Sequence, residues 1–190
     1  MKNIILKTAR LKIAIPTIDS LANWHQLQSD KDVMKYIGDG KAVSAMTTKK
    51  NLAFAINHYQ KYGFSQFDIF LKEDNKFIGI AGLNYLLKDD NNDIEISYLL
   101  QRKYWLKGYA TELSKALIKW GFDNFHFNRI VACCKKPNMA SSNVMKKCGM
   151  QYKGTYLYHG RHQSELYQIN HISITTDNFY LRPFHHRDDF

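Results

Sequence analysis

The chain has 190 residues, of which 45% are hydrophobic and 14% aromatic, and its 27 Lys and Arg against 17 Asp and Glu give a net charge of +10 at pH 7. These values fit one globular domain of ordinary size and exclude a disordered, low-complexity or fibrous chain. The positive charge attracts phosphates. Nucleic acid, an anionic membrane and a phosphorylated cofactor are therefore candidate partners, beside the simpler interpretation of a solubilising surface.

Cysteine usage and hydropathy predict a cytoplasmic protein. The three cysteines, Cys133, Cys134 and Cys148, offer neither a disulfide framework nor a metal-ligand spacing. The first residues lack the apolar stretch of a signal peptide, and nowhere do 18 apolar residues follow one another. The sequence therefore predicts no membrane partner.

The first half of the chain alternates strand and helix patterns. Apolar and polar residues alternate over 10–15, which predicts a strand, and Asp19 and Ser20 are typical openers of a helix. A second helix is predicted over 47–62 from its helical spacing of apolar residues, and Gly63 stands where a helix C-cap belongs.

A hairpin and a further strand follow. Residues 67–72 and 76–85 predict paired strands, because the cluster at 73–75 favours a turn. After a polar loop, alternation resumes at Asp93 and places a carboxylate, Glu95, on one face of a strand.

The second half completes an α/β pattern. Helices are predicted over 108–125 and 138–148 from apolar residues at spacings of three and four. Strands are predicted over 129–134, 150–158 and 163–174. Strands and helices thus alternate with hairpins between them, which predicts a mixed α/β fold whose largely antiparallel sheet is flanked by helices.

A basic loop leads into a helix that starts at Gly108. A helix N-terminus exposes unpaired N–H groups and the positive end of the helix dipole, so it suits a pyrophosphate, and Gly108 and Ala110 let the phosphate approach the backbone. Taken alone, the turn is equally compatible with ordinary helix capping. It matches neither the phosphate loop of nucleoside triphosphatases nor the dinucleotide-binding glycine motif.

Residues 104–113 read Tyr-Trp-Leu-Lys-Gly-Tyr-Ala-Thr-Glu-Leu. This segment resembles the acetyl-CoA signature of the GCN5-related N-acetyltransferases (GNAT), in the form typical of the RimJ/RimL branch of ribosomal-protein N-terminal acetyltransferases. A second family segment resembles residues 138–141 followed by 147–150. The resemblance covers about residues 8–172 and implies the GNAT acyl-CoA N-acyltransferase fold, with splayed central strands. At Leu106 the branch usually has Gly, which puts the affinity for the cofactor in question.

The resemblance also implies a binding site for the cosubstrate acetyl-CoA. The pyrophosphate would be held by backbone groups of residues 107–111, the pantetheine arm by Asn138, and the pantetheine amides by the strand that ends at Leu99 and Leu100. Ser141 would lie near the thioester sulfur. The residues assigned to cofactor binding are therefore Leu99, Leu100, Lys107, Gly108, Tyr109, Ala110, Thr111, Asn138 and Ser141.

Two residues are candidates for catalysis. Glu95 is the candidate base, which would act through a water to deprotonate the reacting amine; its alternative role is a structural salt bridge. Ser141 is the candidate donor to the departing sulfur, and its alternative role is that of a residue at a helix start. Cys133 and Cys134 fit buried core positions better than covalent catalysis. Of the tyrosines 156, 158 and 167, which favour sheet packing, one is expected to line the acceptor pocket.

The function that the resemblance implies is acetyl transfer from acetyl-CoA to a primary amine, by direct attack in a ternary complex. The acceptor would be a protein N-terminus or a small molecule. Two other classes stay open: an RNA-binding or RNA-docking module, which the positive charge favours although no nucleic-acid motif supports it, and a catalytically silent acyl-CoA-binding protein. Both a monomer and a homodimer are compatible with the sequence.

The C-terminal segment is unusual. Residues 175–190 resemble the opening strand of the same family, with Thr176 falling opposite Thr8. Residues 1–174 are thus expected to form the acetyltransferase domain and 175–190 the start of a second, truncated copy; the alternative is an ordinary terminal strand or tail. Four of the eight histidines form two close pairs, His159 with His162 and His185 with His186. No carboxylate or thiol lies at ligand spacing from them, which predicts no metal site.

Overall fold

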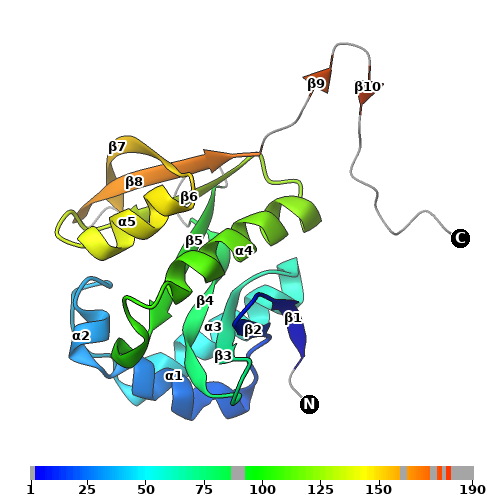
Figure 1. The fold of residues 1–190 in the computed structure, drawn as a ribbon. Coiled ribbons are helices and arrows are strands. Elements are labelled where there is room, and N and C mark those ends of the chain that lie inside the picture. Colours follow the sequence, from blue (N-terminus) through cyan, green and yellow to red (C-terminus); the bar gives the residue numbers. More distant parts are fainter. Residues whose placement is uncertain (1–2, 87–92, 159–161, 172–174, 177–178, 181–190) are drawn as a thin grey trace, which may run out of the picture.

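The computed structural model describes residues 3–86, 93–158, 162–171, 175–176 and 179–180. Its main feature is an eight-stranded sheet with the order β1-β2-β3-β4-β5-β6-β8-β7 (Figure 1). Neighbouring strands are antiparallel except β5 and β6, which run parallel. The strands are β1 Ile4–Lys7, β2 Leu11–Ala14, β3 Gln66–Leu71, β4 Phe77–Tyr85, β5 Ile94–Leu100, β6 Arg129–Cys134, β7 Gln151–Tyr158 and β8 His162–Asn170.

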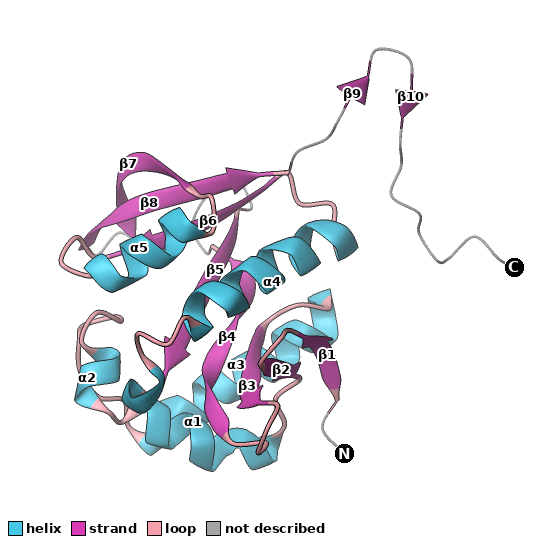
Figure 2. Ribbon diagram, viewed as in Figure 1, coloured by secondary structure: helices cyan, strands magenta, loops and turns pink. Residues whose placement is uncertain are grey.

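Helices cover both faces of this sheet (Figure 2). On one face α4 packs against β4 and β5 and contacts α5, and the fully buried Leu113 and Leu117 of α4 join the larger core. On the other face Trp24 and Leu27 of α1 and Leu52 of α3 form a second core with residues of the sheet. The helices are η1 Ile18–Ser20, α1 Leu21–Gln28, α2 Lys31–Met34, α3 Ala45–Tyr62, η2 Arg102–Tyr104, α4 Tyr109–Asn124 and α5 Met139–Lys147.

The central strands β5 and β6 separate soon after they begin. They pair only where Ile94 faces Ile130 and Glu95 faces Val131, although β5 continues to Leu100. A strand edge that lacks a neighbouring strand leaves N–H and C=O groups for another partner. The predicted mixed α/β fold with splayed central strands is therefore confirmed, and the splay opens a slot at the centre of the sheet.

Most predicted elements are present, and two short ones were missed. Gly63 ends α3 with φ 78, as its C-cap position predicted. β1 and α2 have four residues each, too few for a periodic pattern. The side chain of Asp30 caps α2 by accepting hydrogen bonds from the backbone N–H groups of Asp32 and Val33. The helix predicted at Asp19 begins as the 3-10 turn η1 and continues as α1.

The tail forms a sheet of its own where it is described. Strands β9 (Thr175–Thr176) and β10 (Phe179–Tyr180) are antiparallel and pair with each other. The other residues of 175–190 lie outside the described chain, as do His159, His185 and His186 of the histidine pairs. Over the described residues, no helix is long and apolar enough to cross a bilayer and no cluster of three potential metal ligands occurs.

Candidate active site

The start of α4 has the geometry of an anion site. Its N-cap is Gly108, which has φ 80 and brings no capping side chain, so the N–H groups of the first turn, which includes Tyr109, are left without a side-chain cap. The next residue back, Lys107, adds a positive charge to the same loop. This arrangement fits a pyrophosphate, because the donors and the helix dipole point the same way.

Leu106 adopts a backbone conformation that favours glycine. Its φ is 59, and its side chain is 100% exposed. The left-handed region costs a residue with a Cβ about 1–2 kcal/mol. This cost is a physical reason why the RimJ/RimL branch usually has Gly at this position. The side chain gains no burial in return.

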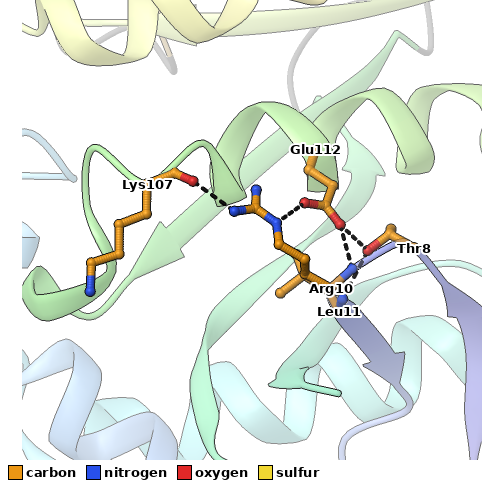
Figure 3. A network of polar contacts seen from close by, with 5 residues as sticks. All are labelled: Thr8, Arg10, Leu11, Lys107 and Glu112. Carbon is orange, nitrogen blue, oxygen red and sulfur yellow. Dashed lines mark hydrogen bonds and ion pairs between the residues drawn. The ribbon is translucent and has the colours of Figure 1, made fainter. Parts of the chain in front are cut away.

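A polar network ties the start of the chain to this loop (Figure 3). The Glu112 carboxylate accepts hydrogen bonds from Thr8 Oγ1 at 2.6 Å, from the backbone N–H of Arg10 at 2.8 Å and from Arg10 Nε at 2.7 Å. Arg10 Nη1 also donates to the carbonyl of Lys107 at 3.0 Å. Its guanidinium stacks 4.3 Å from the ring centre of Tyr109. Arg10 thereby joins the loop to the first turn of α4.

The charge state of Glu112 follows from this network. Burial tends to raise the pKa of its carboxyl, but the hydrogen bonds from Thr8 and Arg10 outweigh burial and hold the pKa below its usual value. Glu112 is therefore a carboxylate at neutral pH. The adjacent Arg10 compensates its charge beside the proposed pyrophosphate site.

The end of β5 reaches the slot. Leu99 and Leu100 lie beyond the last pair between β5 and β6, and Leu99 lines a cavity, whereas Leu100 is buried in the core. The carbonyl of Leu100 accepts a hydrogen bond from Trp105 Nε1 at 2.7 Å. This bond folds the loop before α4 back against β5.

The N-terminus of α5 faces the same strand. Asn138 caps the helix, since its side-chain oxygen accepts the backbone N–H of Ser141 at 3.2 Å. The hydroxyl of Ser141 lies 2.9 Å from the hydroxyl of Tyr98, which comes from β5. Ser141 is thus held both by its helix and by the strand beside the slot.

Glu95 lies in a cavity of about 360 Å³ that Tyr98 also lines, although the two side chains leave β5 on opposite faces. Its Oε2 accepts a hydrogen bond from the hydroxyl of Tyr158 at 2.8 Å. Burial raises the pKa of Glu95 to about 7, although the hydrogen bonds from Tyr158 and from the backbone of Cys133 act in the opposite direction. A carboxylate with a pKa near neutrality is suited to accept a proton at physiological pH.

Elements from across the fold line this cavity. α1 and α3 contribute Trp24 and Phe54, and the loop before α3 contributes Gly38, whose carbonyl accepts a hydrogen bond from Lys135 Nζ at 2.7 Å. Among the described residues that line the cavity, Glu95 is the only carboxylate. The cavity is thus mostly aromatic and polar, with one acidic group.

Some sequence expectations need correction or completion here. Cys134 is buried as expected, but Cys133 is only partly buried, and both line the cavity next to the splay of β6 from β5. Of the three tyrosines considered, Tyr158 lines the cavity. Two functional contacts were missed, Tyr158 with Glu95 and Arg10 with Glu112; they join residues 63 and 102 positions apart, and no local pattern signals them.

Comparisons of the sequence and of the structure with known proteins both find N-acetyltransferases. The model of the acetyltransferase (GNAT) domain family matches residues 10–151. The uncharacterized N-acetyltransferase YnaD of Bacillus subtilis is 30% identical over 133 residues, which are 70% of this chain and 74% of YnaD. A GNAT-family acetyltransferase structure from Bacillus anthracis is 28% identical, with a TM-score of 0.73, over 87% of this chain and 97% of that one.

A further solved structure carries a ligand. RimL, a ribosomal L7/L12 alpha-N-protein acetyltransferase solved in complex with coenzyme A, has a TM-score of 0.74 and covers 88% of this chain and 98% of its own. Its sequence identity is 20%, so this likeness concerns the fold.

Proposed function

Because the chain belongs to the acetyltransferase (GNAT) domain family and is an acetyl-CoA-dependent N-acetyltransferase, we propose that it acetylates the N-terminal amine of a protein or peptide, with Glu95 as the base. The observation that carries this proposal is Glu95, the one carboxylate among the described residues that line the cavity, whose pKa is about 7 and which lies where β5 and β6 part. The first residues of the acceptor would occupy the cavity.

Acetyl-CoA supplies an activated acetyl group and a thiolate leaving group. For its part, the chain binds the pyrophosphate with the backbone at residues 107–111, and Leu99 and Leu100 offer strand edges to the pantetheine amides. Asn138 caps the start of α5, and it would contact the pantetheine arm there. These roles rest on the geometry of a helix N-terminus without a side-chain cap and of a strand edge without a neighbouring strand.

On the acceptor side, Glu95 takes the proton that the amine must lose. An α-amine has a pKa of about 8, so much of it is ammonium at neutral pH and cannot attack. The ammonium first gives one proton to Glu95 through a water. The neutral amine then forms the C–N bond as the C–S bond breaks, the electron pair of the C–S bond leaves on sulfur, and the second proton of the nitrogen goes to solvent. Ser141 donates a hydrogen bond to the sulfur, which gains a proton from solvent afterwards.

The cavity favours an acceptor with one positive charge. A polycation needs several carboxylates to replace its hydration, whereas Glu95 is the only one among the described lining residues and Lys135 adds a positive charge. The cavity volume of about 360 Å³ lies at the small end of ligand sites. Phe54 and Ile37 line it and are 50% and 39% exposed, which suits an acceptor that continues past the rim.

The acceptor class is tested with a panel of amines. Release of the CoA thiol and the mass of the product are measured for a short peptide with a free N-terminus, the same peptide with a blocked N-terminus, spermidine and an aminoglycoside. We expect acetylation of the free peptide at its N-terminus and little transfer to the polycations. Preferential transfer to spermidine or to the aminoglycoside would refute the proposed acceptor.

The pyrophosphate site is tested separately by binding. Gly108→Val places a branched side chain in the left-handed region at the start of α4, and its Cβ would lie 3.4 Å from Arg10 Nη2. Gly149→Val is a matched control, since its φ of 82 resembles the φ of 80 at Gly108 and an added Cβ meets only Ile169, at 3.9 Å. We expect both variants to lose stability and only Gly108→Val to lose acetyl-CoA binding, measured by calorimetry. Unchanged binding in Gly108→Val would place the cofactor elsewhere.

We also propose that residues 1–174 form the acetyltransferase domain and that 175–190 correspond to the opening strand of a second copy. The support is that β9 and β10 pair with each other and not with the eight-stranded sheet. Deletion of residues 175–190 should leave the melting temperature and turnover unchanged. Loss of cooperative unfolding in the shortened chain would refute this division.

A further inference from the structure

Two consecutive serines of α5 each make a hydrogen bond to a tyrosine of the sheet. Ser141 Oγ lies 2.9 Å from the hydroxyl of Tyr98 on β5, and Ser142 Oγ lies 2.7 Å from the hydroxyl of Tyr167 on β8. The two pairs have the same chemistry and nearly the same length. They differ in what surrounds them.

The pair formed by Ser142 and Tyr167 is closed inside the core, since the two residues are 1% and 2% exposed. The other pair lies at the slot: Tyr98 lines the cavity that also holds Glu95, and Ser141 is partly exposed. Tyr98 lies beyond the last paired residues of β5 and β6. One pair therefore has access to bound substrates and the other does not.

We propose that Tyr98 is a positioning residue that orients the hydroxyl of Ser141 toward the departing sulfur. The inference rests on the proposed function, in which Ser141 donates to that sulfur. A serine hydroxyl rotates freely and has one hydrogen to give. The phenol oxygen of Tyr98 lies nearer to Ser141 Oγ, at 2.9 Å, than to the carbonyl oxygen of Ser141, at 3.4 Å. When the phenol donates to Ser141 Oγ, the hydrogen of Ser141 points away from Tyr98 and is left for another acceptor.

The environment of Tyr98 suits a donor that stays neutral. Burial of the phenol raises the pKa of Tyr98 well above its ordinary value. Tyr98 therefore keeps its proton throughout the reaction. The proton balance of the transfer is unchanged: the amine proton goes to Glu95, the C–S electron pair leaves on sulfur, and neither hydroxyl is consumed.

Glu95 and Tyr98 lie three residues apart on one strand, and β-strand geometry directs their side chains to opposite faces. Within the cavity that both residues line, Tyr98 contacts Ser141 of α5 and Glu95 contacts Tyr158 of β7. The strand thus separates the group that accepts the proton from the group that steadies the leaving sulfur. Because Tyr98 belongs to β5 and contacts Ser141, the position of the Ser141 hydroxyl depends on the position of β5.

The test is a double-mutant cycle on the full-length protein. Turnover of acetyl-CoA with a free-N-terminus peptide is measured for Tyr98→Phe, Ser141→Ala and the double variant, with Tyr167→Phe as the control that removes the matched hydrogen bond inside the core. We expect Tyr98→Phe to lower kcat about tenfold, the effect of about 1.4 kcal/mol of hydrogen bonding, with little change in the KM for acetyl-CoA. The double variant should be no slower than Ser141→Ala alone.

Two further readouts separate positioning from a structural role. The loss in Tyr98→Phe should be constant between pH 6.5 and 9, because a higher pH frees the amine but supplies no donor to sulfur. Tyr167→Phe should lower the melting temperature and keep the parent kcat.

The inference fails if Tyr98→Phe turns over at the parent rate, or if its effect multiplies with that of Ser141→Ala. An equal loss of kcat in Tyr167→Phe also overturns it, because the cause would then be the stability of α5. A parent protein that acetylates no amine would instead refute the proposed function, so the two failures are distinct.

Discussion

Replacing Glu95 by Gln should stabilise the protein, and the gain should grow with pH. Glu95→Gln keeps the shape of the side chain and its bond from Tyr158, but it removes the charge that burial disfavours. Groups placed for catalysis commonly cost stability in this way. The same substitution removes the proposed base, so the variant should be more stable and slower.

The size of the effect follows from the pKa of Glu95. The pKa is about 7 in the folded protein against 4.5 for an unperturbed carboxyl, a difference that corresponds to about 3 kcal/mol. Because the folded pKa is raised, the folded carboxyl keeps a proton that the unfolded chain has released, and stability is lost as pH rises from 4.5 to 7. Above pH 7 the loss is complete. Gln does not titrate, so the Glu95→Gln variant does not lose this stability as the pH rises.

The assay is urea unfolding of both proteins between pH 4.5 and 8.5, together with turnover. At pH 4.5 the two free energies of unfolding should agree, and at pH 8 the variant should be more stable by about 3 kcal/mol. Glu165→Gln is the control for turnover, since Glu165 lies on β8 beside Tyr167 and does not line the cavity. A stability difference that does not change with pH would refute the reasoning that burial raises the pKa of Glu95.

Three further predictions concern the surroundings of the site. Tyr158→Phe removes a hydrogen bond to the Glu95 carboxylate, so the midpoint of the pH–rate profile should move upward by about one pH unit. Leu106→Gly relieves a left-handed backbone at a fully exposed side chain, so the melting temperature should rise on the order of 2 °C. Arg10→Met leaves the Glu112 carboxylate without its ion pair of 2.7 Å, and the Kd for acetyl-CoA measured by calorimetry should rise about fivefold, as expected for a partly exposed pair.

Each of these has a contrary result. A pH–rate midpoint that stays fixed or moves down in Tyr158→Phe would mean that the phenol does not stabilise the anion. A lower melting temperature in Leu106→Gly would show that the Leu106 side chain has a packing partner. An unchanged Kd in Arg10→Met would separate the network of Figure 3 from cofactor binding.

The order of strands and helices could be predicted because local patterns carry it. α4 has apolar residues at spacings of three and four and starts at Gly108, and α3 ends at Gly63 where a left-handed residue is needed. The alternation of apolar and polar residues along β5 also predicts which face of the sheet the Glu95 side chain occupies. Elements of four residues, such as β1 and α2, are too short for any such period, and tertiary packing determines them.

The surroundings of the site could not be predicted in the same way. Glu95 owes its raised pKa to burial in a cavity and its main side-chain contact to Tyr158 on β7, and both depend on the pairing of distant strands. The partner of Ser141, Tyr98, lies 43 positions earlier in the chain. Sequence periodicity predicts which face a residue occupies, whereas the pairs that meet across elements follow from the assembled fold.

The most direct test of the proposed mechanism is the pH dependence of kcat/KM, which reports the ionisation of the free enzyme and free substrate. It is measured for the parent and Glu95→Gln with two acceptors, one with an α-amine of pKa about 8 and one with an ε-amine of pKa about 10. The account predicts a rising limb with a midpoint near pH 7 that keeps its position when the amine is exchanged and is absent in Glu95→Gln. A profile in which every limb moves with the pKa of the amine, and which Glu95→Gln reproduces, would contradict the claim that Glu95 is the base.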